Sequence, residues 1–242
     1  MDMTDKTALV TGANKSIGYE TARRLGEAGY RIWLGSRDRE RGEAAAAELR
    51  QKGLDVRMLE IDVASDASVE AAALRVFEED GRLDALVNNA GILGSMLAPS
   101  EEPIAIIKDV YEVNVFGPIR TTQAFLPLLK AASRANVVMV SSGLGSLGGL
   151  TDPASEFYAI NILGYNSSKT ALNAATVAFS KEFAAAGIKV NSADPGYTAT
   201  DFNGHSGYRT VGQAAEIIVR LATLDENGPT GGYFYDEGPL PW

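Results

Sequence analysis

The 242-residue sequence contains no cysteine and a single histidine, His205. Without cysteine the chain cannot form a disulfide, a thiolate zinc site, an iron–sulfur cluster or a thiol nucleophile. One histidine is too few for the paired histidines of an H-E-x-x-H metal site, and a Ser-His-Asp hydrolase would depend on His205 alone. We therefore expect no metal centre, and acid–base chemistry must use other side chains.

Positive charge and long apolar runs are also scarce. The chain has 31 acidic against 22 basic residues, a net charge of −9. Nucleic-acid binding depends on neutralising many phosphates, so this balance argues against such a partner. No apolar run approaches the ~20 residues of a membrane span, and the first residues are too polar for a signal peptide. The sequence predicts a cytoplasmic protein without nucleic-acid or membrane partners.

Short β-branched or apolar runs alternate with longer Ala-rich amphipathic runs, which predicts repeated βα units. Strands are expected near 7–10, 31–35, 55–61, 85–88, 137–141, 189–193 and 232–235. Helices are expected near 17–27, 39–52, 66–79, 104–132, 162–185 and 210–223. Because no linker or repeat interrupts this pattern, we predict one α/β domain over residues 1–242. Its expected form is a three-layer, Rossmann-like, doubly wound parallel sheet of about seven strands.

A glycine-containing loop, Thr11–Gly18, follows the first predicted strand and opens a helix. Its backbone N–H groups and the positive end of the helix dipole would suit a pyrophosphate. The loop lacks the full G-x-G-x-x-G pattern because Ser16 takes the central position, so an ordinary strand-to-helix turn is the alternative. The candidate ligand-binding residues of this loop are Gly12, Asn14, Lys15, Ser16, Ile17 and Gly18.

The end of the second predicted strand indicates which dinucleotide would bind. In dinucleotide-binding folds an acidic residue there binds the ribose 2′-OH, whereas an arginine accommodates a 2′-phosphate. This chain has Arg37 at that place, and Lys15 can reach the same region. The planar guanidinium and the second cation favour NADP(H) over NAD(H). The alternative is that both are solvated surface cations.

Tyr165 and Lys169 lie four positions apart in a predicted helix, so they share one face. A cation beside a tyrosine favours the phenolate, and we expect Lys169 to lower the pKa of Tyr165 toward neutrality. The pair would then supply acid–base chemistry without histidine. Because such pairs also occur by chance on exposed helices, the rest of the chain must support this interpretation.

Polar side chains end two further predicted strands, Asn88–Gly91 and the pair Ser141 and Ser142. Open parallel sheets bind ligands at the carboxyl ends of their strands, so these residues are candidates for the same site. Asn114 lies inside an apolar helical stretch, where its amide needs partners. The alternative for Asn114 is a satisfied core or helix-bending asparagine.

Taken together and in order, these motifs resemble the short-chain dehydrogenase/reductase family of classical type, and most closely its NADPH-dependent carbonyl reductases. The resemblance covers essentially the whole chain. It implies an enzyme that transfers a hydride between NADP(H) and a small-molecule ketone, aldehyde or secondary alcohol. A hydrophobic substrate is suggested by apolar residues that could form a pocket, with helix packing as the alternative: Leu93, Met96, Leu144, Phe157, Tyr158 and Ile160. The motifs that carry the resemblance are Thr11–Gly18, Asp62 with Val63, Asn88–Gly91, Asn114, Ser142, Tyr165 with Lys169, and 195–200.

The resemblance also implies roles for individual residues. Tyr165 would deliver the proton and Ser142 would bind the substrate oxygen, with Ser141 as the alternative serine. Lys169 would bind the nicotinamide ribose, and Asn114 would hold a water in a relay to Lys169. Further contacts with the cofactor are implied for Asp62 and Val63 (adenine), for Asn89, Ala90 and Gly91 (adenosine pocket), and for Pro195, Gly196, Thr198 and Thr200 (nicotinamide).

Two departures from the family pattern qualify the resemblance. Ser16 adds a side chain where the loop usually has glycine, and the spacing between Ser142 and Tyr165 leaves an insertion at about 150–162. Such an insertion favours a monomer, with a dimer or tetramer left open, and the segment at about 200–210 is the expected substrate lid. A catalytically silent NADP-binding sensor or regulatory protein is the alternative function.

Overall fold

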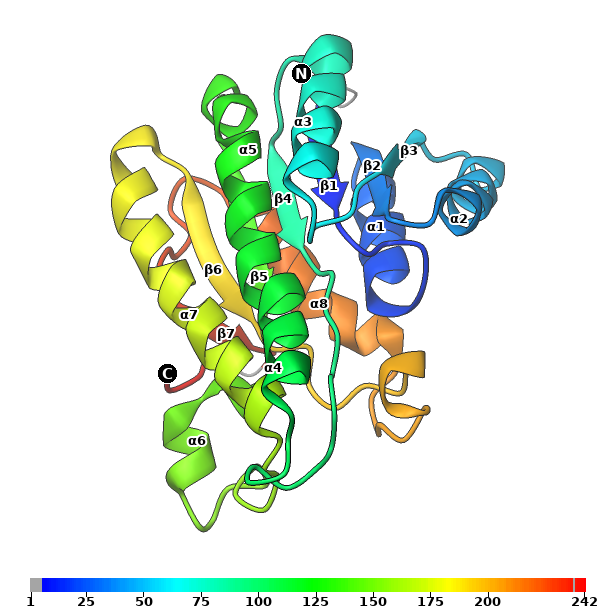
Figure 1. Cartoon of the computed structure of the whole chain (residues 1–242). Coiled ribbons are helices and arrows are strands. Elements are labelled where there is room, and N and C mark those ends of the chain that lie inside the picture. Colours follow the sequence, from blue (N-terminus) through cyan, green and yellow to red (C-terminus); the bar gives the residue numbers. More distant parts are fainter. Residues whose placement is uncertain (1–5, 237) are drawn as a thin grey trace.

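The computed structural model describes residues 6–236 and 238–242, which form one eight-stranded sheet flanked by helices (Figure 1). The strands are β1 (Lys6–Val10), β2 (Tyr30–Ser36), β3 (Val56–Glu60), β4 (Ala85–Asn88), β5 (Asn136–Val140), β6 (Lys189–Ala193), β7 (Tyr233–Tyr235) and β8 (Gly238–Pro239). Their order is β3-β2-β1-β4-β5-β6-β7-β8, parallel as far as β7, with β8 antiparallel to β7. Because β1 pairs with both β2 and β4, the winding direction reverses there, and such switch points bind ligands in open α/β sheets.

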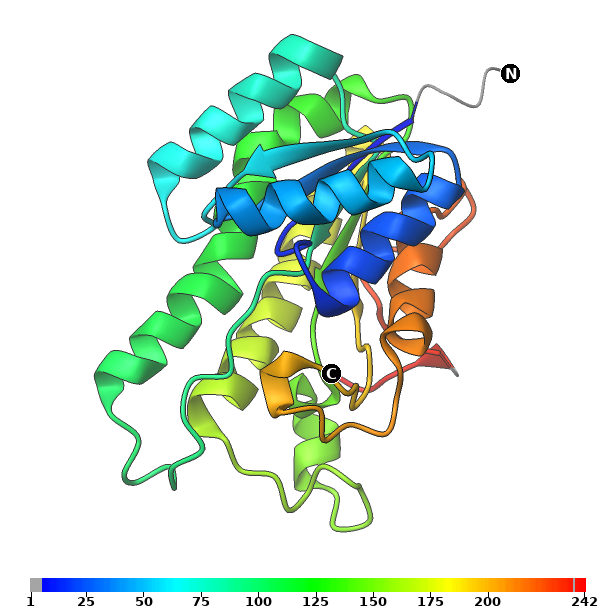
Figure 2. The same cartoon turned by 90° about the vertical axis from the view of Figure 1, so that its right-hand side faces the viewer.

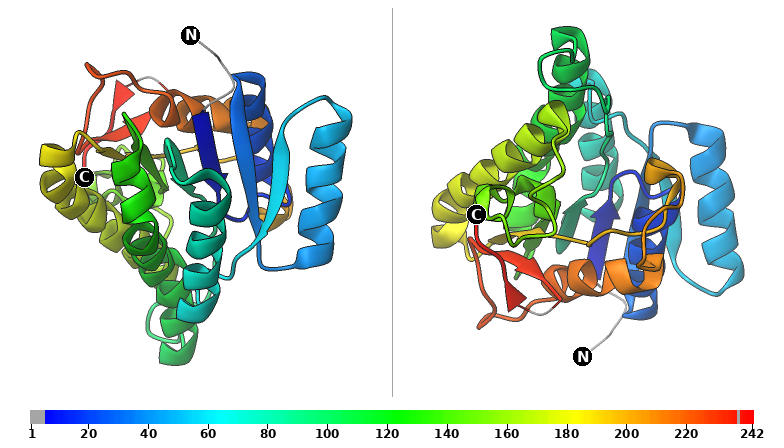
Figure 3. Two further views of the ribbon diagram at one scale, coloured as in Figure 1. Left: turned by 90° about the horizontal axis from the view of Figure 1, so that it is seen from above. Right: turned by 90° about the horizontal axis from the view of Figure 1, so that it is seen from below.

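Helices cover both faces of this sheet, as the views along it show (Figure 3). One face carries α1 (Ser16–Glu27), α2 (Arg39–Gln51) and α8 (Val211–Ala222), and the other carries α3 (Asp66–Asp80), α4 (Ile104–Tyr111), α5 (Gly117–Ala131) and α7 (Leu163–Phe183). The predicted single α/β domain with three layers is confirmed. All seven predicted strands are present, and among the strands of the described residues only the two-residue β8 has no counterpart in the prediction.

Two buried apolar clusters, one on each side of the sheet, hold the layers together. Neighbouring residues of a strand point to opposite faces, so Leu9 packs in one cluster while Val10 packs in the other. Trp33 and Leu34 of β2 divide in the same way. Strands covered on both faces need continuous apolar runs, which explains why these segments are recognisable in the sequence.

The predicted continuous helix over 104–132 is wrong, because a five-residue π-helix, Glu112–Phe116, separates α4 from α5. Pro118 has no N–H, so it cannot donate the α-helical hydrogen bond to the carbonyl of Asn114, four residues earlier. Asn114 lies in the middle of this wider turn and is fully buried. Single π-turns inside α-helices are frequent at functional sites.

Ser16 adopts a left-handed backbone conformation, with a φ of 52°. This conformation brings the Cβ of an L-residue too close to the following carbonyl oxygen, at a cost of about 1–2 kcal/mol. Glycine avoids the clash, and Gly12 in the same loop has a φ of 62°. The loop therefore keeps a glycine-like conformation at a position that holds serine.

Replacing Ser16 with glycine should raise the free energy of unfolding by about 0.5–1 kcal/mol, since the relief of strain exceeds the entropy that glycine adds to the unfolded chain. Urea denaturation followed by circular dichroism measures this. Ser167 lies in the right-handed backbone of α7, so Ser167→Gly should change stability in the opposite direction. Equal destabilisation by both substitutions would contradict the strain at Ser16.

Candidate active site

The predicted site motifs lie at the carboxyl ends of β1 to β6, at one end of the molecule. The start of α7, the short helix α6 (Leu147–Thr151) and the segment 200–210 lie at this same end (Figures 1 and 2). The parallel topology therefore brings together residues from the whole length of the chain.

Tyr165 and Lys169 lie in the first turns of α7, and both are buried. The Lys169 Nζ atom is 5.7 Å from the centroid of the Tyr165 ring. It also donates a hydrogen bond of 2.7 Å to the carbonyl oxygen of Val140, the last residue of β5. The predicted pair thus shares one face of the helix, and Lys169 ties that helix to the end of a neighbouring strand.

A buried carboxylate fixes the beginning of α7. Glu102 Oε2 accepts a hydrogen bond of 2.9 Å from the backbone N–H of Gly164, next to Tyr165. A negative charge at a helix N-terminus is favoured by the helix dipole. A Cβ atom at Gly164 would lie 2.9 Å from Glu102 Oε1, so glycine is needed for this close contact.

The expected shift of the Tyr165 pKa toward neutrality is wrong for this structure, because the net shift is upward. Burial removes the phenol from water and raises its pKa well above the usual value, and the charge of Asp194 raises it further. A hydrogen bond with the Ser142 side chain acts in the opposite direction but is the smaller effect. Burial also lowers the pKa of Lys169 to about 8. Tyr165 therefore keeps its proton at neutral pH in this structure.

Of the two candidate serines, Ser142 is the one that reaches Tyr165. Ser142 is half-buried at the start of a tight turn (Gly143–Gly145), and its hydroxyl accepts a hydrogen bond of 3.3 Å from the N–H of Leu144. Ser141 is buried at the end of β5. Two hydroxyl groups, those of Ser142 and Tyr165, can therefore hold one oxygen atom of a ligand.

The Asn114 side chain joins the segment after β4 to α7. Its Oδ1 accepts from the N–H of Ile92 at 2.8 Å, and its Nδ2 donates to the carbonyl of Ile92 at 2.9 Å and to Ser168 Oγ at 3.1 Å. A Cβ atom at Gly91 would lie 3.3 Å from Asn114 Oδ1 and 3.8 Å from Lys169 Nζ. Asn114 is thus next to Lys169 and satisfied by protein groups, and its role in a water relay stays a prediction.

The glycine-containing loop is held by Asn89. The Asn89 Nδ2 atom donates to the carbonyls of Thr11 and Gly12 at 2.8 and 3.2 Å. A Cβ atom at Gly18 would lie 2.5 Å from this Nδ2, so the loop packs too closely for a side chain there. This amide nitrogen is used by the loop itself, and it fixes the shape of the loop.

The loop and the start of α1 fit a dinucleotide phosphate. Among the described residues no side chain caps α1, and its first turn contains no acid, so its N–H groups and positive dipole end can face an anion. An open cavity of about 480 Å³ lies beside them. Residues that line it include Asn14, Lys15, Ser16, Tyr19, Arg41 and Asp201.

The arginine that lines this cavity is Arg41, in the first turns of α2, and not Arg37. Arg37 is exposed at the end of β2. Arg41 was not among the residues expected for this site, because it lies within a charged run that is typical of an exposed helix face. Arg41 thus lines the same cavity as Lys15, and the role of Arg37 toward a cofactor stays a prediction.

The other residues that the resemblance implies for cofactor binding follow the carboxyl ends of further strands. Asp62 follows β3 and accepts from the N–H of Ala64 at 3.1 Å, and Val63 is buried against Gly117. Thr198 donates to the carbonyl of Pro195 at 3.2 Å. These contacts organise the turns, and the roles of the residues toward a cofactor stay predictions.

The predicted lid contacts several parts of the site. Thr198 and Arg209 form a β-bridge that closes its base. Within it, Asp201 pairs with Lys15 at 2.8 Å, and the Phe202 ring lies 5.6 Å from that of Tyr165. The Tyr208 hydroxyl contacts Glu156 of the predicted insertion at 3.5 Å.

The insertion covers the turn that carries Ser142. A Cβ atom at Gly143 would lie 2.2 Å from the Phe157 ring, so this ring packs directly on the turn. The C-terminal residues also pack here, because Ser146 Oγ donates to the carbonyl of Pro241 at 2.7 Å. The short helix α6 ends where the insertion begins, and it has no counterpart among the predicted helices.

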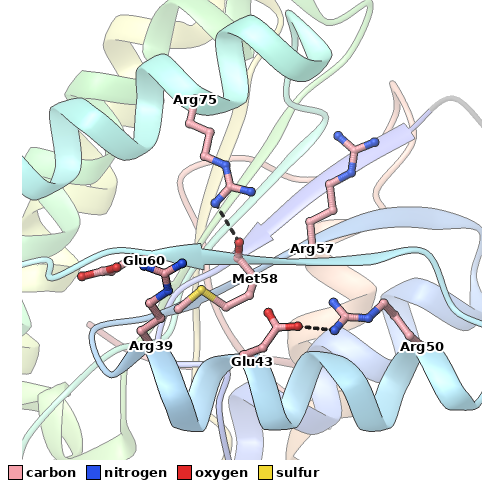
Figure 4. Close-up of a pocket in the computed structure, with 7 residues that line it drawn as sticks. All are labelled: Arg39, Glu43, Arg50, Arg57, Met58, Glu60 and Arg75. Carbon is pink, nitrogen blue, oxygen red and sulfur yellow. Dashed lines mark hydrogen bonds and ion pairs between the residues drawn. The ribbon is translucent and has the colours of Figure 1, made fainter.

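A second cavity, of about 370 Å³, lies along the free edge of β3 (Figure 4). Arg75 reaches from α3 and donates to the carbonyl of Met58 at 3.1 Å, while Arg50 of α2 pairs with Glu43. These arginines satisfy the edge strand and its neighbouring helix, away from Tyr165. In residues 6–236 and 238–242, no group of His, Asp or Glu side chains could hold a metal ion, and no helix is long and apolar enough to span a membrane.

Known proteins are similar to this chain in sequence and in fold. The family model described as short chain dehydrogenase matches residues 6–209. The chain is 36% identical over 231 residues to the short-chain dehydrogenase anuI of Penicillium roqueforti (strain FM164), covering 91% of this chain and 90% of that one. It is 32% identical over 300 residues to (−)-isopiperitenone reductase of Mentha piperita, covering 94% and 95%.

A solved structure gives the same result. The NADPH-bound carbonyl reductase from chicken fatty liver superposes with a TM-score of 0.87 at 29% identity, covering 98% of this chain and 99% of that one. The fold, the ordered motifs and the similarity over nearly the full length agree with one another. The chain belongs to the short-chain dehydrogenase/reductase family of oxidoreductases.

Proposed function

We propose that the protein is an NADP(H)-dependent carbonyl reductase that converts a ketone or aldehyde to an alcohol, and that runs in reverse on secondary alcohols. The observation that carries this proposal is the buried Tyr165 hydroxyl, hydrogen-bonded to Ser142 and supported by Lys169. The names of two relatives, (−)-isopiperitenone reductase and an NADPH-bound carbonyl reductase, support a reductase, and the second supports carbonyl reduction with NADPH.

The site residues would divide the reaction among them. Bound NADPH supplies the hydride, which the carbonyl carbon accepts. Negative charge then develops on the carbonyl oxygen, where the Ser142 and Tyr165 hydroxyls donate hydrogen bonds. Tyr165 gives its proton to this oxygen, so the product is the alcohol. The Lys169 ammonium, near the Tyr165 ring, stabilises the phenolate that remains.

The cations beside the glycine-containing loop support NADP(H) over NAD(H). Lys15 and Arg41 line the same cavity at the start of α1, and a 2′-phosphate would bring them a dianionic partner. In a chain with a net charge of −9, such a local pair is needed to attract a strongly anionic ligand.

Apolar rings beside the catalytic hydroxyls support a hydrophobic substrate. Phe202 of the lid packs near Tyr165, and Phe157 of the insertion packs on the turn of Ser142. The substrate itself, the monomeric state and the cytoplasmic location stay predictions from the sequence.

Replacing Tyr165 with phenylalanine should lower kcat for carbonyl reduction about 100-fold or more, because the general acid is lost. NADPH oxidation with a panel of ketones and aldehydes measures this, and NADPH fluorescence should show unchanged cofactor binding. Tyr30 is also a buried tyrosine, at the opposite end of the sheet, so Tyr30→Phe is the matched control and should retain activity. Near-normal turnover by the Tyr165 variant would contradict the assignment. NADPH binding without turnover of any carbonyl by the wild-type protein would favour a silent sensor.

Removing either cation of the loop cavity should weaken binding of NADPH but not of NADH. Lys15→Ala and Arg41→Ala should each raise the KM for NADPH about tenfold. This is the loss of affinity expected when one charge-assisted hydrogen bond is removed. Arg39 lines the other cavity, at the β3 edge, and Arg39→Ala is the matched control. Equal catalytic efficiency of the wild-type protein with NADH and NADPH would rule out the proposed preference.

Carbonyl reduction should slow as the pH rises above about 8. Lys169 has a pKa of about 8 because it is buried, so its charge is present below this pH and lost above it. Tyr165, whose pKa is raised, keeps its proton throughout. The rate should therefore follow Lys169, which is measured as kcat at saturating NADPH from neutral to alkaline pH. A rate that continues to rise above pH 8 would contradict the expectation that Lys169 loses its proton before Tyr165 does.

A further inference from the structure

Asp194 is a buried carboxylate at the active site to which no role has been given so far. It follows β6 directly, precedes Pro195, and is 4% exposed. Its Oδ1 atom accepts a hydrogen bond of 2.9 Å from the N–H of Gly196, and the N–H of Gly143 also donates to the carboxylate. One side chain thus connects the turn after β5 with the loop after β6.

The two donors are glycines, and the surroundings of each leave no room for a side chain. A Cβ atom at Gly143 would lie 2.2 Å from the Phe157 ring, and one at Gly196 would lie 2.6 Å from the Arg209 side chain. Gly196 also has a φ of 70°, which favours glycine. The carboxylate therefore supplies a contact between these backbones that neither glycine can make. Hydrogen bonds to a charged acceptor are stronger than those to a neutral one.

The charge of Asp194 acts on the catalytic pair. It raises the pKa of Tyr165 and that of Lys169, because a nearby negative charge opposes the loss of a proton from either group. Burial raises the pKa of Asp194 itself, while the two backbone donors and Arg209 oppose this shift. The other titratable groups that interact with it are Glu156, Tyr208, Tyr233 and Tyr235.

We infer that Asp194 is a positioning residue, whose carboxylate clamps the turn carrying Ser142 to the loop that begins at Pro195. Through this clamp it sets the place of the Ser142 hydroxyl relative to Tyr165 and to the loop implied in nicotinamide binding. The functional part of this inference rests on the proposed carbonyl reduction, whereas the clamp itself does not.

The clamp is tested first by hydrogen–deuterium exchange on the full-length protein without a substrate. In Asp194→Ala, the amides of segments 142–146 and 194–198 should exchange about tenfold faster or more, since each loses an acceptor. Asp194→Asn keeps one acceptor oxygen and the shape of the side chain, so it should speed exchange less. This variant tests the clamp if Asp194→Ala does not fold.

A second buried aspartate provides the matched control. Asp84 is at the opposite end of the sheet and accepts from the backbone N–H of Thr7 at 2.8 Å. Asp84→Asn should speed exchange in segment 7–10 and leave both active-site segments unchanged. Wild-type exchange rates in both segments of both Asp194 variants would overturn the clamp.

Activity is the second readout. Asp194→Ala should lower kcat about 100-fold, as misplacement of a catalytic group by about 1 Å can do, with a partial rescue in Asp194→Asn. In both variants the alkaline decline of carbonyl reduction should move to lower pH, because the negative charge that supports the Lys169 ammonium is gone. Asp84→Asn should change neither kcat nor this decline.

Two outcomes separate this inference from the proposed function. Faster exchange with a wild-type kcat and an unchanged pH profile would show that Asp194 only stabilises the fold, which would overturn its role in positioning. Absence of turnover by the wild-type protein would refute carbonyl reduction, while the exchange data would still decide the clamp.

Discussion

The hydrogen bond from Lys169 Nζ to the carbonyl of Val140 is the contact on which the active site depends. It places an ammonium group in a buried position between α7 and the end of β5, next to Tyr165. The charge is costly to bury and its pKa falls to about 8 for that reason. Tyr165 experiences the same dry surroundings, which keep its proton in place. In the proposed reduction, this shared burial favours donation of the Tyr165 proton to a substrate oxygen.

Most of the fold could be predicted from the sequence because strands covered on both faces contain short apolar runs, such as 8–10 in β1 and 137–140 in β5. The exceptions have local causes. The break at Glu112–Phe116 lies just before Pro118, which cannot donate a helical hydrogen bond, and the spacing of apolar residues does not show where such a break falls. The strand β8 has only two residues and its register comes from pairing with β7.

The site could be predicted where residues that lie close together in the sequence also lie close together in the structure. Tyr165 and Lys169 lie one helical turn apart, so the sequence places them on one face. Asp194 and Glu102 were missed because their partners, Gly143 and Gly164, are distant in sequence and contribute only backbone N–H groups. The sign of the Tyr165 pKa shift was also missed, since burial depends on the packing of several segments.

Tertiary packing also joins the two halves of the site. Asp201 of the lid pairs with Lys15 of the glycine-containing loop, while Phe202 lies against Tyr165. The Phe157 ring of the insertion covers the turn after Ser142. The lid segment thus contacts the candidate cofactor side through Asp201 and the catalytic side through Phe202, so the shapes of the two sides depend on each other.

The most direct test of the central claim is transfer of deuterium from NADPH labelled at C4 of the nicotinamide to a prochiral ketone, followed by mass spectrometry of the alcohol. We expect one deuterium at the carbinol carbon, delivered from only one face of the nicotinamide. Binding of NADPH with no labelled alcohol from any carbonyl compound would contradict the account and would leave the chain as a cofactor-binding protein without catalysis.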